Sequence, residues 1–353
     1  MFGDVLFPSE TWTQFGVRHV VKGIPGTEQI GILAPEILKA IQEGRTGQTM
    51  RGIERGDYAQ LRAAPPPNRD ITTQPFRQWE FAVTRDGYDI LVTACCLEAL
   101  AEEVKPAVIY FHGGGWRAGS RKQVQNPLRL LSQFSGAVIF NVEYRLAPEY
   151  RYPCATDDCW WVVKYVHHHA SELRVDARRI TVAGDSAGGN LAAACARRDR
   201  NGRTRLIHQQ ILIYPALANC YTDASPYESV RTNGSGYLLT SVKMEDYLKL
   251  YERSSADRQD PYFSPLCARD YSRLPDSLIL TAEFDPLRDE GEEYGRRMRK
   301  AGGRVRIERI AGALHGYFAL GIKHLYVQES FRHINRFLHV ERAIQEKGKE
   351  QEM

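Results

Sequence analysis

The sequence predicts an α/β protein built around one mostly parallel central sheet that is flanked by helices. From residue 107 onward, short apolar segments alternate with longer helix-like segments, as parallel strands alternate with the helices that join them. The chain has 353 residues, enough for one large domain or two ordinary ones. With 43% apolar and 25% charged residues, its composition is that of an ordinary globular protein.

The expected elements follow this alternation along the chain. A β-hairpin comes first, because period-2 segments flank an Asp86-Gly87 turn. Strands are expected at Ala107–Phe111, Ala137–Val142, Ile180–Ala183, Ile211–Tyr214, Leu278–Thr281 and Val305–Ile310. Helices are expected at Pro127–Phe134, Ala155–His169, Ala187–Arg198, Leu287–Ala301 and Ile322–Leu338. In sheets of this kind ligands bind at the carboxyl ends of the strands, so candidate site residues should directly follow strands.

Two segments depart from the alternation, and together they predict a helical cap over the strand ends. Residues 1–75 form an N-terminal cap segment and linker, with weak helical patterns at 34–43 and 52–61 before a triple-proline break. Residues 218–262 form a cap insertion rich in Tyr, Ser, Asp and Gly, helical near 242–251. The core is expected in two parts, 76–217 and 263–340, followed by a charged tail over 341–353 that should fray.

Charge and cysteine usage argue against several classes of protein. The net charge of +4 is small and both signs are interspersed, so no nucleic-acid-binding stripe is expected. The N-terminus lacks a secretory-signal pattern, and no apolar run approaches the ~20 residues that span a bilayer. The 7 cysteines show no Cys-x-x-Cys spacing, which favours free thiols in a reducing cytoplasm. We therefore expect a cytoplasmic protein.

The pentapeptide Gly184-Asp185-Ser186-Ala187-Gly188 is the first candidate for chemistry. It lies between a β-rich segment and a helix of small residues, the setting of a nucleophile elbow. Glycines are needed at both flanks because a side chain would collide in so tight a turn. Such a turn would expose Ser186 at the carboxyl edge of the sheet, above a helix N-terminus that favours negative charge. Alone the motif is only suggestive, and its strand–turn–helix context strengthens it.

A glycine loop supplies a second part of an acyl-transfer site. His112-Gly113-Gly114-Gly115-Trp116 directly follows a predicted strand. Consecutive glycines let the backbone turn its N–H groups toward a ligand without interference from a Cβ atom. The alternative is an ordinary flexible loop.

A carboxylate and a base complete the candidate set. Asp285 follows the strand near Leu278–Thr281, although an Asp in this place also commonly caps the next helix. Its rivals are Glu283, which is nearer the strand body, and Asp289, which lies inside the helix. His315 lies in the loop after the last strand, so the order along the chain is Ser, Asp, His.

Other histidines offer weaker alternatives. His324, His333 and His339 fall on the last helix, away from any strand end. The run His167-His168-His169 resembles a metal site, but consecutive helical positions diverge by about 100° and cannot converge on one ion. We therefore interpret this run as a solvated helix end and expect no metal.

These segments resemble the hormone-sensitive-lipase-like family of α/β-hydrolase carboxylesterases. The resemblance runs from about residue 104 to 340, and it includes the glycine loop, the elbow, Glu143-Tyr144-Arg145-Leu146-Ala147-Pro148-Glu149, Asp285-Pro286-Leu287-Arg288-Asp289-Glu290 and His315-Gly316-Tyr317. It implies the α/β-hydrolase fold, with a helical cap made from an N-terminal segment and an insertion.

The resemblance also implies a role for each site residue. Ser186 would be the nucleophile, His315 the general base and then acid, and Asp285 the carboxylate that orients His315. The N–H groups of Gly113, Gly114 and Ala187 would form the oxyanion hole.

The expected activity is serine esterase chemistry on a small-molecule ester, without a metal or organic cofactor. Trp116, Tyr214 and Tyr317 are candidates for the substrate pocket, and Tyr317, where the family usually has Phe, would add a polar group. Family members favour short acyl chains, and the polar, Tyr-rich insertion favours a hydroxylated or sugar-like alcohol. A homodimer is compatible with the family.

Two alternatives use the same fold. One is a receptor-like small-molecule-binding protein, as in the gibberellin receptors, although those have lost the histidine that this chain retains at His315. The other is an amidase that uses the same triad.

Overall fold

The computed structural model describes the backbone of residues 9–14, 17–22, 58–65, 70–320 and 324–351. The strands of the structure include one at each predicted position, most extended where Ile180–Ala183 becomes Val175–Asp185, and two near the N-terminus that were not predicted. They are β1 (Ser9–Gln14), β2 (Val17–Lys22), β3 (Phe76–Arg85), β4 (Tyr88–Leu97), β5 (Lys105–Phe111), β6 (Val138–Glu143), β7 (Val175–Asp185), β8 (Gln209–Ile213), β9 (Asp276–Phe284) and β10 (Val305–Leu314).

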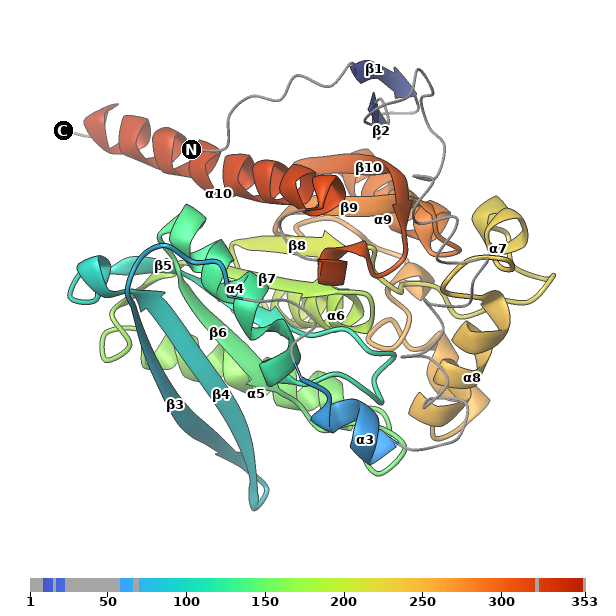
Figure 1. Ribbon diagram of the computed structural model, residues 1–353, viewed down its shortest axis with the longest axis horizontal. Helices are drawn as coiled ribbons and strands as arrows, with labels where there is room; N and C mark the ends of the chain where they lie inside the picture. The colour runs from blue at the N-terminus through green and yellow to red at the C-terminus, as the bar shows by residue number, and fades with distance from the viewer. Residues whose placement is uncertain (1–8, 15–16, 23–57, 66–69, 321–323, 352–353) are drawn as a thin grey trace.

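All of these strands belong to one ten-stranded sheet, in the order β1-β2-β10-β9-β8-β7-β5-β6-β4-β3 (Figure 1). Neighbouring strands from β2 to β6 are parallel, and β1, β4 and β3 are each antiparallel to their neighbour. The mostly parallel sheet is therefore confirmed. The hairpin is confirmed too, because Arg85 pairs with Tyr88 across Asp86 and Gly87, whose φ values are 49° and 76°.

Helices cover both faces of the sheet. They are α4 (Arg121–Ser135), α5 (Cys154–His168), α6 (Ala187–Gly202), α9 (Arg288–Lys300) and α10 (Leu325–Gln351). In β5, Ile109 and Phe111 pack in the core that includes α5, α6 and α9, whereas Val108 and Tyr110 pack in the core that includes α4 and α10. This alternation of two apolar faces explains why the strand has a continuous apolar sequence.

The insertion at residues 218–262 contains α7 (Glu228–Thr232) and α8 (Ser241–Tyr251), at the right of Figure 1. The helical pattern predicted near 242–251 is thus confirmed. Thr240 caps α8, since its hydroxyl accepts the Lys243 N–H at 3.2 Å. The buried residues of α8 have the spacing of one helical face, and they are Met244, Tyr247, Leu248 and Tyr251. This face joins the core of the molecule instead of forming a separate one.

Both ends of the chain differ from the sequence prediction. The N-terminal segment contributes strands: β2 pairs with β10 and extends the sheet. Of the predicted helical patterns, 34–43 lies outside the described residues, whereas 52–61 overlaps α3 (Tyr58–Ala63). At the other end, α10 continues to Gln351, through most of the tail over 341–353 that was expected to fray. The tail is rich in Glu, Gln and Lys, which are good helix formers despite their charge.

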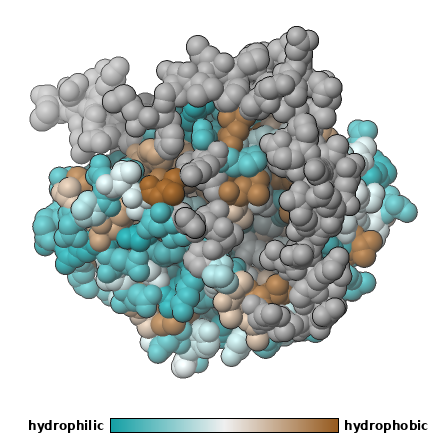
Figure 2. Space-filling view, in the orientation of Figure 1, coloured by the Kyte–Doolittle hydropathy of each residue, from teal (hydrophilic) through white to brown (hydrophobic). Residues whose placement is uncertain are grey.

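The described surface is mixed in polarity. On the face shown in Figure 2, hydrophilic residues lie over much of β3, β4 and α4, with apolar residues in small groups between them. The described cysteines are all free thiols, as predicted. Among the helices that the structure describes, none has the length and apolar character needed to cross a membrane.

Candidate active site

Ser186 occupies a sharp turn between β7 and α6. Its φ of 56° and ψ of −119° are rare for a residue with a side chain, and such strain is typical of functional turns. The flanking glycines are required by contact: a Cβ atom at Gly184 would collide with the Gly188 backbone, and one at Gly188 with the Phe111 carbonyl oxygen. The predicted nucleophile elbow is therefore present in the backbone.

Neighbouring strands hold this turn at the carboxyl edge of the sheet. The Ser186 N–H donates to the carbonyl oxygen of Ile213, at the end of β8, at 2.8 Å. The Ser186 carbonyl oxygen accepts the N–H of Ala216 at 3.3 Å and that of Asn190 at 3.1 Å. The half-buried serine is thus fixed where a ligand would bind in a parallel sheet.

The structure brings together the three side chains that lie far apart in the sequence. Ser186 Oγ lies 2.9 Å from Nε2 of His315, and His315 Nδ1 lies 2.7 Å from Oδ2 of Asp285. Asp285 is fully buried, whereas the His315 side chain is 12% exposed. A serine hydroxyl, an imidazole and a buried carboxylate in this linear contact form the geometry of an activated nucleophile.

Asp285 also caps the helix that follows it, which was the alternative role suggested by its position in the sequence. Its Oδ1 accepts the Leu287 N–H at 2.9 Å at the start of α9, while Oδ2 faces His315. One carboxylate oxygen therefore fixes the turn and the other orients the imidazole.

The rival carboxylates are engaged elsewhere. Glu283 accepts the Gly312 N–H at 2.6 Å, and burial raises the pKa of Glu283. Asp289 accepts the Ser229 N–H at 2.7 Å. Burial alone would raise the pKa of Asp289, but its pairing with Arg288 lowers that pKa overall. Neither carboxylate has a recorded contact with the imidazole of His315.

The rival histidines also have other surroundings. His324 packs its ring against Tyr326, and His333 Nε2 lies 3.0 Å from Glu329 Oε1. The side chain of His339 lies outside the described residues. His168 and His169 each place Nδ1 near a carbonyl oxygen one turn earlier in α5, at 2.6 Å and 3.0 Å.

The glycine loop after β5 requires a change to the predicted oxyanion donors. The Gly113 N–H donates to Asp185 Oδ1 at 2.9 Å, so it is already engaged and is a poor candidate. Among the described residues, no acceptor contacts the N–H groups of Gly114, Gly115 or Ala187. Gly114 and Gly115 have φ values of 129° and 62°, which only glycine adopts readily.

Asp185 and Tyr144 support this loop, and their roles were missed from the sequence. Besides the Gly113 N–H, Asp185 Oδ1 accepts the Tyr110 hydroxyl at 2.8 Å. Burial raises the pKa of Asp185, against the opposing effect of these two hydrogen bonds. Tyr144 donates to the His112 carbonyl oxygen at 2.6 Å and stacks on its ring. The motif residues around Ser186 and after β6 therefore anchor the loop.

Comparison with known proteins agrees with this geometry. A family model described as the alpha/beta hydrolase fold matches residues 108–319. The chain belongs to this α/β-hydrolase family. This confirms the resemblance to the hormone-sensitive-lipase-like carboxylesterases.

Similar α/β hydrolases are named as esterases. Carboxylesterase NlhH of Mycobacterium tuberculosis is 36% identical over 274 residues, covering 76% of this chain and 83% of the relative. An arylesterase of Saccharolobus solfataricus is 37% identical over 211 residues, covering 60% of this chain and 67% of the relative. A solved thermophilic carboxylesterase from a metagenomic library has a TM-score of 0.74 at 34% identity, covering 82% of this chain and 96% of that structure. This α/β hydrolase is accordingly a carboxylic ester hydrolase.

The three aromatic residues expected in the substrate pocket of this hydrolase are buried instead. Trp116 is 1% exposed and stacks on Tyr251, with ring centroids 4.8 Å apart. Tyr214 is also 1% exposed, and its ring contacts His315 at 4.8 Å between centroids, so it packs against the imidazole. Tyr317 places its hydroxyl 2.7 Å from Ser330 Oγ on α10, so its polar group does not serve the site.

The inserted segment 218–262 contacts both the loop that carries Asp285 and the glycine loop. From α7, the Ser229 hydroxyl donates to the Pro286 carbonyl oxygen at 2.8 Å, next to Asp285. From α8, the Tyr247 ring lies where a Cβ atom of Gly115 would be, directly against the glycine loop. The insertion therefore supports both the glycine loop and the loop that carries Asp285, which we call the acid loop.

The N-terminal helix α3 holds the glycine loop from another side. Arg62 donates to the carbonyl oxygens of Arg117 and Ala147, each at 2.9 Å, and it pairs with Glu149 at 2.8 Å. Arg117 in turn lies over the Tyr247 ring, 4.1 Å from its centroid. The helix before the triple proline thus contacts the chain directly after the glycine loop.

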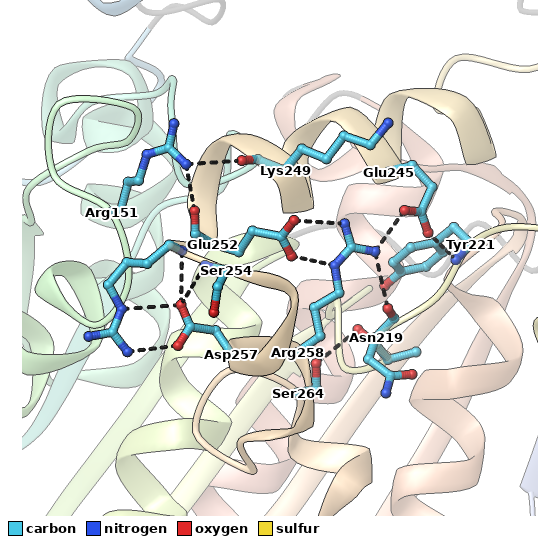
Figure 3. Close-up of polar contacts among 12 residues, drawn as sticks. Arg151, Asn219, Tyr221, Glu245, Lys249, Glu252, Ser254, Asp257, Arg258 and Ser264 are labelled. Carbon is cyan, nitrogen blue, oxygen red and sulfur yellow. Dashed lines mark hydrogen bonds and ion pairs between the residues drawn. The ribbon is translucent and has the colours of Figure 1, made fainter.

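A charged network fixes α8 to its flanks (Figure 3). Arg258 lies between two glutamates of this region, with Glu245 at 2.7 Å and Glu252 in close contact. Glu245 also accepts the Tyr221 N–H at 2.6 Å, and Arg151 donates to the Glu252 carbonyl oxygen at 2.7 Å. Because Arg258 and both glutamates are largely buried, this network limits the positions that α8 can take.

Proposed function

We propose that this chain is a serine carboxylesterase that hydrolyses short-chain acyl esters through an acyl-enzyme intermediate. The observation that carries the proposal is the contact chain of Ser186 Oγ, His315 and Asp285, with distances of 2.9 Å and 2.7 Å. Short acyl groups are supported by a relative named ethyl acetate hydrolase from Pseudomonas putida, which is 38% identical over 217 residues.

The proposed reaction has two halves. His315 Nε2 takes the Ser186 proton as Oγ attacks the ester carbonyl carbon, and the protonated imidazole then gives that proton to the departing alcohol. A water molecule next loses a proton to His315 and attacks the acyl carbon, which releases the acid and restores the serine. Asp285 stabilises the charged imidazole in both halves and keeps Nδ1 facing away from the substrate.

The proposed oxyanion donors are the N–H groups of Gly114, Gly115 and Ala187. Gly114 is retained from the sequence prediction together with Ala187, and Gly115 replaces Gly113 because Asp185 engages the latter. A donor of this kind typically contributes ~3 kcal/mol to stabilisation of the transition state.

Residues 218–262 and the segment before residue 76 are proposed to shape the pocket as a cap. The contacts of α7, α8 and α3 with the catalytic loops support this division of the chain. A hydroxylated or sugar-like alcohol remains a proposal. That proposal rests on the tyrosines of the insertion. Two of them, Tyr221 and Tyr251, are buried and hydrogen-bonded within the protein, so they do not support it.

The decisive experiment replaces the nucleophile and the base. S186A and H315Q should each lose at least 10³-fold in p-nitrophenyl acetate turnover, whereas H324Q should retain it, because the ring of His324 packs on Tyr326 and His315 is the histidine in contact with Ser186. A fluorophosphonate probe should label wild type and spare S186A. Activity of S186A near that of wild type would contradict the assignment.

Substrate range needs a separate panel. Acyl esters of increasing chain length test the short-chain proposal, and acetylated sugars test the proposed alcohol. Matched ester and amide substrates separate an esterase from an amidase. Failure of the fluorophosphonate probe to label wild type would favour the receptor-like alternative.

Localisation and assembly are proposed from weaker observations. The free cysteines support a reducing cytoplasm, which cell fractionation would test. A homodimer is proposed from the family resemblance alone, and light scattering after size-exclusion chromatography would test it.

A further inference from the structure

Five arginines line one groove of the molecule. We call this the arginine groove, and it is lined by Arg200, Arg203, Arg205, Arg273 and Arg304. Its volume is about 690 Å³. These residues come from three separate segments of the sequence, so the cluster exists only in the folded chain.

The groove lies at the amino ends of the strands, away from the catalytic serine. Arg205 precedes β8, Arg273 precedes β9 and Arg304 directly precedes β10. Ser186 follows the carboxyl end of β7, which runs parallel to β8. The groove is therefore a second concave site, distinct from the ester site.

The carboxylates near the groove are already committed. Asp199 accepts the Thr204 hydroxyl at 2.6 Å and the N–H groups of Leu206 and Ile207 at 2.9 Å and 3.1 Å. Asp276 pairs with Arg304 at 2.5 Å. Asp276 is therefore paired with Arg304, whereas Asp199 keeps its negative charge but is buried and forms no ion pair with the groove arginines among the described residues.

Three arginines are left without a counter-charge. The side chains of Arg203, Arg205 and Arg273 make no hydrogen bond or ion pair with another described residue, whereas Arg200 pairs with Asp270. Burial, and after it the charges of Arg197 and Arg273, lower the pKa of Arg200. The carboxyl end of α6 attracts cations, but a helix end carries only about half a unit of negative charge.

The backbone at these arginines adds a second observation. Arg203, Arg205 and Arg273 have φ values of 56°, 54° and 57°, in the left-handed region that glycine and asparagine adopt more easily. At Arg203 this conformation ends α6, as is common at helix carboxyl ends, and the side chains of all three arginines are exposed to solvent.

We propose that the arginine groove binds a small molecule that carries a pyrophosphate or triphosphate group. Three uncompensated guanidinium groups match a ligand with about three negative charges, and guanidinium forks bind phosphate oxygens in pairs. The volume of about 690 Å³ lies within the range of small-molecule sites and favours such a ligand over a polymer.

The experiment measures binding of inorganic tripolyphosphate by isothermal titration calorimetry at low ionic strength. Wild type should bind one equivalent, and R203Q/R205Q/R273Q should bind at least tenfold more weakly. The matched control is R77Q/R332Q/R336Q, which removes the same charge from exposed residues outside the groove and should stay within twofold of wild type. Adenosine triphosphate should bind wild type at the same site and compete with tripolyphosphate.

Three results would overturn the proposal. They are the absence of tripolyphosphate binding to wild type, an equal loss of affinity in both triple variants, and binding of a short oligothymidylate without binding of tripolyphosphate. The last result would instead identify a nucleic-acid surface. Equal melting temperatures and equal p-nitrophenyl acetate turnover in the three proteins would show that the variants are folded.

Discussion

The carboxylate of Asp185 accepts the backbone N–H of Gly113 at 2.9 Å and so joins the residue before the nucleophile to the glycine loop. The same oxygen accepts the buried Tyr110 hydroxyl at 2.8 Å. One carboxylate therefore fixes the relative positions of the elbow and of the loop that carries the oxyanion donors.

This relationship predicts that Asp185→Ala lowers kcat by about 10²-fold, because a displaced loop loses about one oxyanion donor. Asp185→Asn should retain most of the activity, since its amide oxygen can still accept both hydrogen bonds. Steady-state kinetics on p-nitrophenyl acetate, well below the melting temperature of each variant, measures the difference. Tyr110→Phe is the matched control, because it removes the other donor and leaves Gly113 anchored. A normal kcat in Asp185→Ala would refute this positioning role.

The elbow glycines predict a large difference between two Gly→Ala substitutions. Gly188→Ala should destabilise the protein by about 3 kcal/mol or more, since the new Cβ atom would collide with the Phe111 carbonyl oxygen. A Cβ atom at Gly302 would meet nothing within 4 Å, but the φ of this residue is 86°. Gly302→Ala should therefore cost only about 1–2 kcal/mol of backbone strain. Urea denaturation compares the two, and equal costs would show that the elbow is not tightly packed.

A buried glutamate predicts a pH dependence of stability. Glu290 is fully buried, and its Oε1 accepts the Leu217 N–H at 2.6 Å and the Tyr221 hydroxyl at 2.8 Å. Burial raises the pKa of Glu290 to about 8 in the folded protein. The folded state therefore holds this proton more tightly than the unfolded state does. Its stabilising contribution is complete at low pH and decreases as the pH rises from about 4.3 toward 8.

Because of Glu290, the free energy of unfolding should fall with rising pH by up to about 1.4 kcal/mol per pH unit. This limit corresponds to the release of one proton on unfolding. Urea denaturation at several pH values between 5 and 8 measures it. Glu290→Gln should flatten the slope, and Glu293→Gln, on the same helix with its carboxylate paired to Arg297, should leave it unchanged. Equal slopes in wild type and Glu290→Gln would contradict the assignment.

The orientation of Tyr317 predicts an effect on stability without an effect on catalysis. Ser330 Oγ donates to the Tyr326 carbonyl oxygen at 3.0 Å, so the Tyr317 hydroxyl is the donor to Ser330. Tyr317→Phe should cost about 1 kcal/mol and keep kcat/KM within twofold. Ser330→Ala should cost more, about 1–3 kcal/mol, because it leaves the tyrosine hydroxyl buried without an acceptor. A large fall in kcat/KM for Tyr317→Phe would place its hydroxyl in the reaction.

Residues placed by the local sequence pattern could be predicted, whereas contacts between distant segments could not. Ser186, Asp285 and His315 could be found because each directly follows a strand, and parallel strands deliver their carboxyl ends to one edge. The engagement of Gly113 could not be found, because it depends on how two loops face each other across the sheet.

The burial of two aromatic residues and the clustering of the arginines could not be predicted from the sequence either. Trp116 and Tyr317 seemed suited to a pocket because they adjoin catalytic motifs, but their rings pack on Tyr251 and next to α10. Net charge gave no sign of the arginine groove, since its members are spread from residue 200 to residue 304. Strand β2 was missed because its pairing partner, β10, lies almost the whole chain away.

The insertion at residues 218–262 holds the acid loop through Ser229 and presses the Tyr247 ring against the glycine loop. Both residues are buried, so a substitution at either one would be felt directly by the loop that it contacts. Any change there is transmitted to the two loops that carry out the chemistry. If the proposed triad and cap are correct, a substitution in this insertion would therefore alter the turnover rate together with the substrate preference.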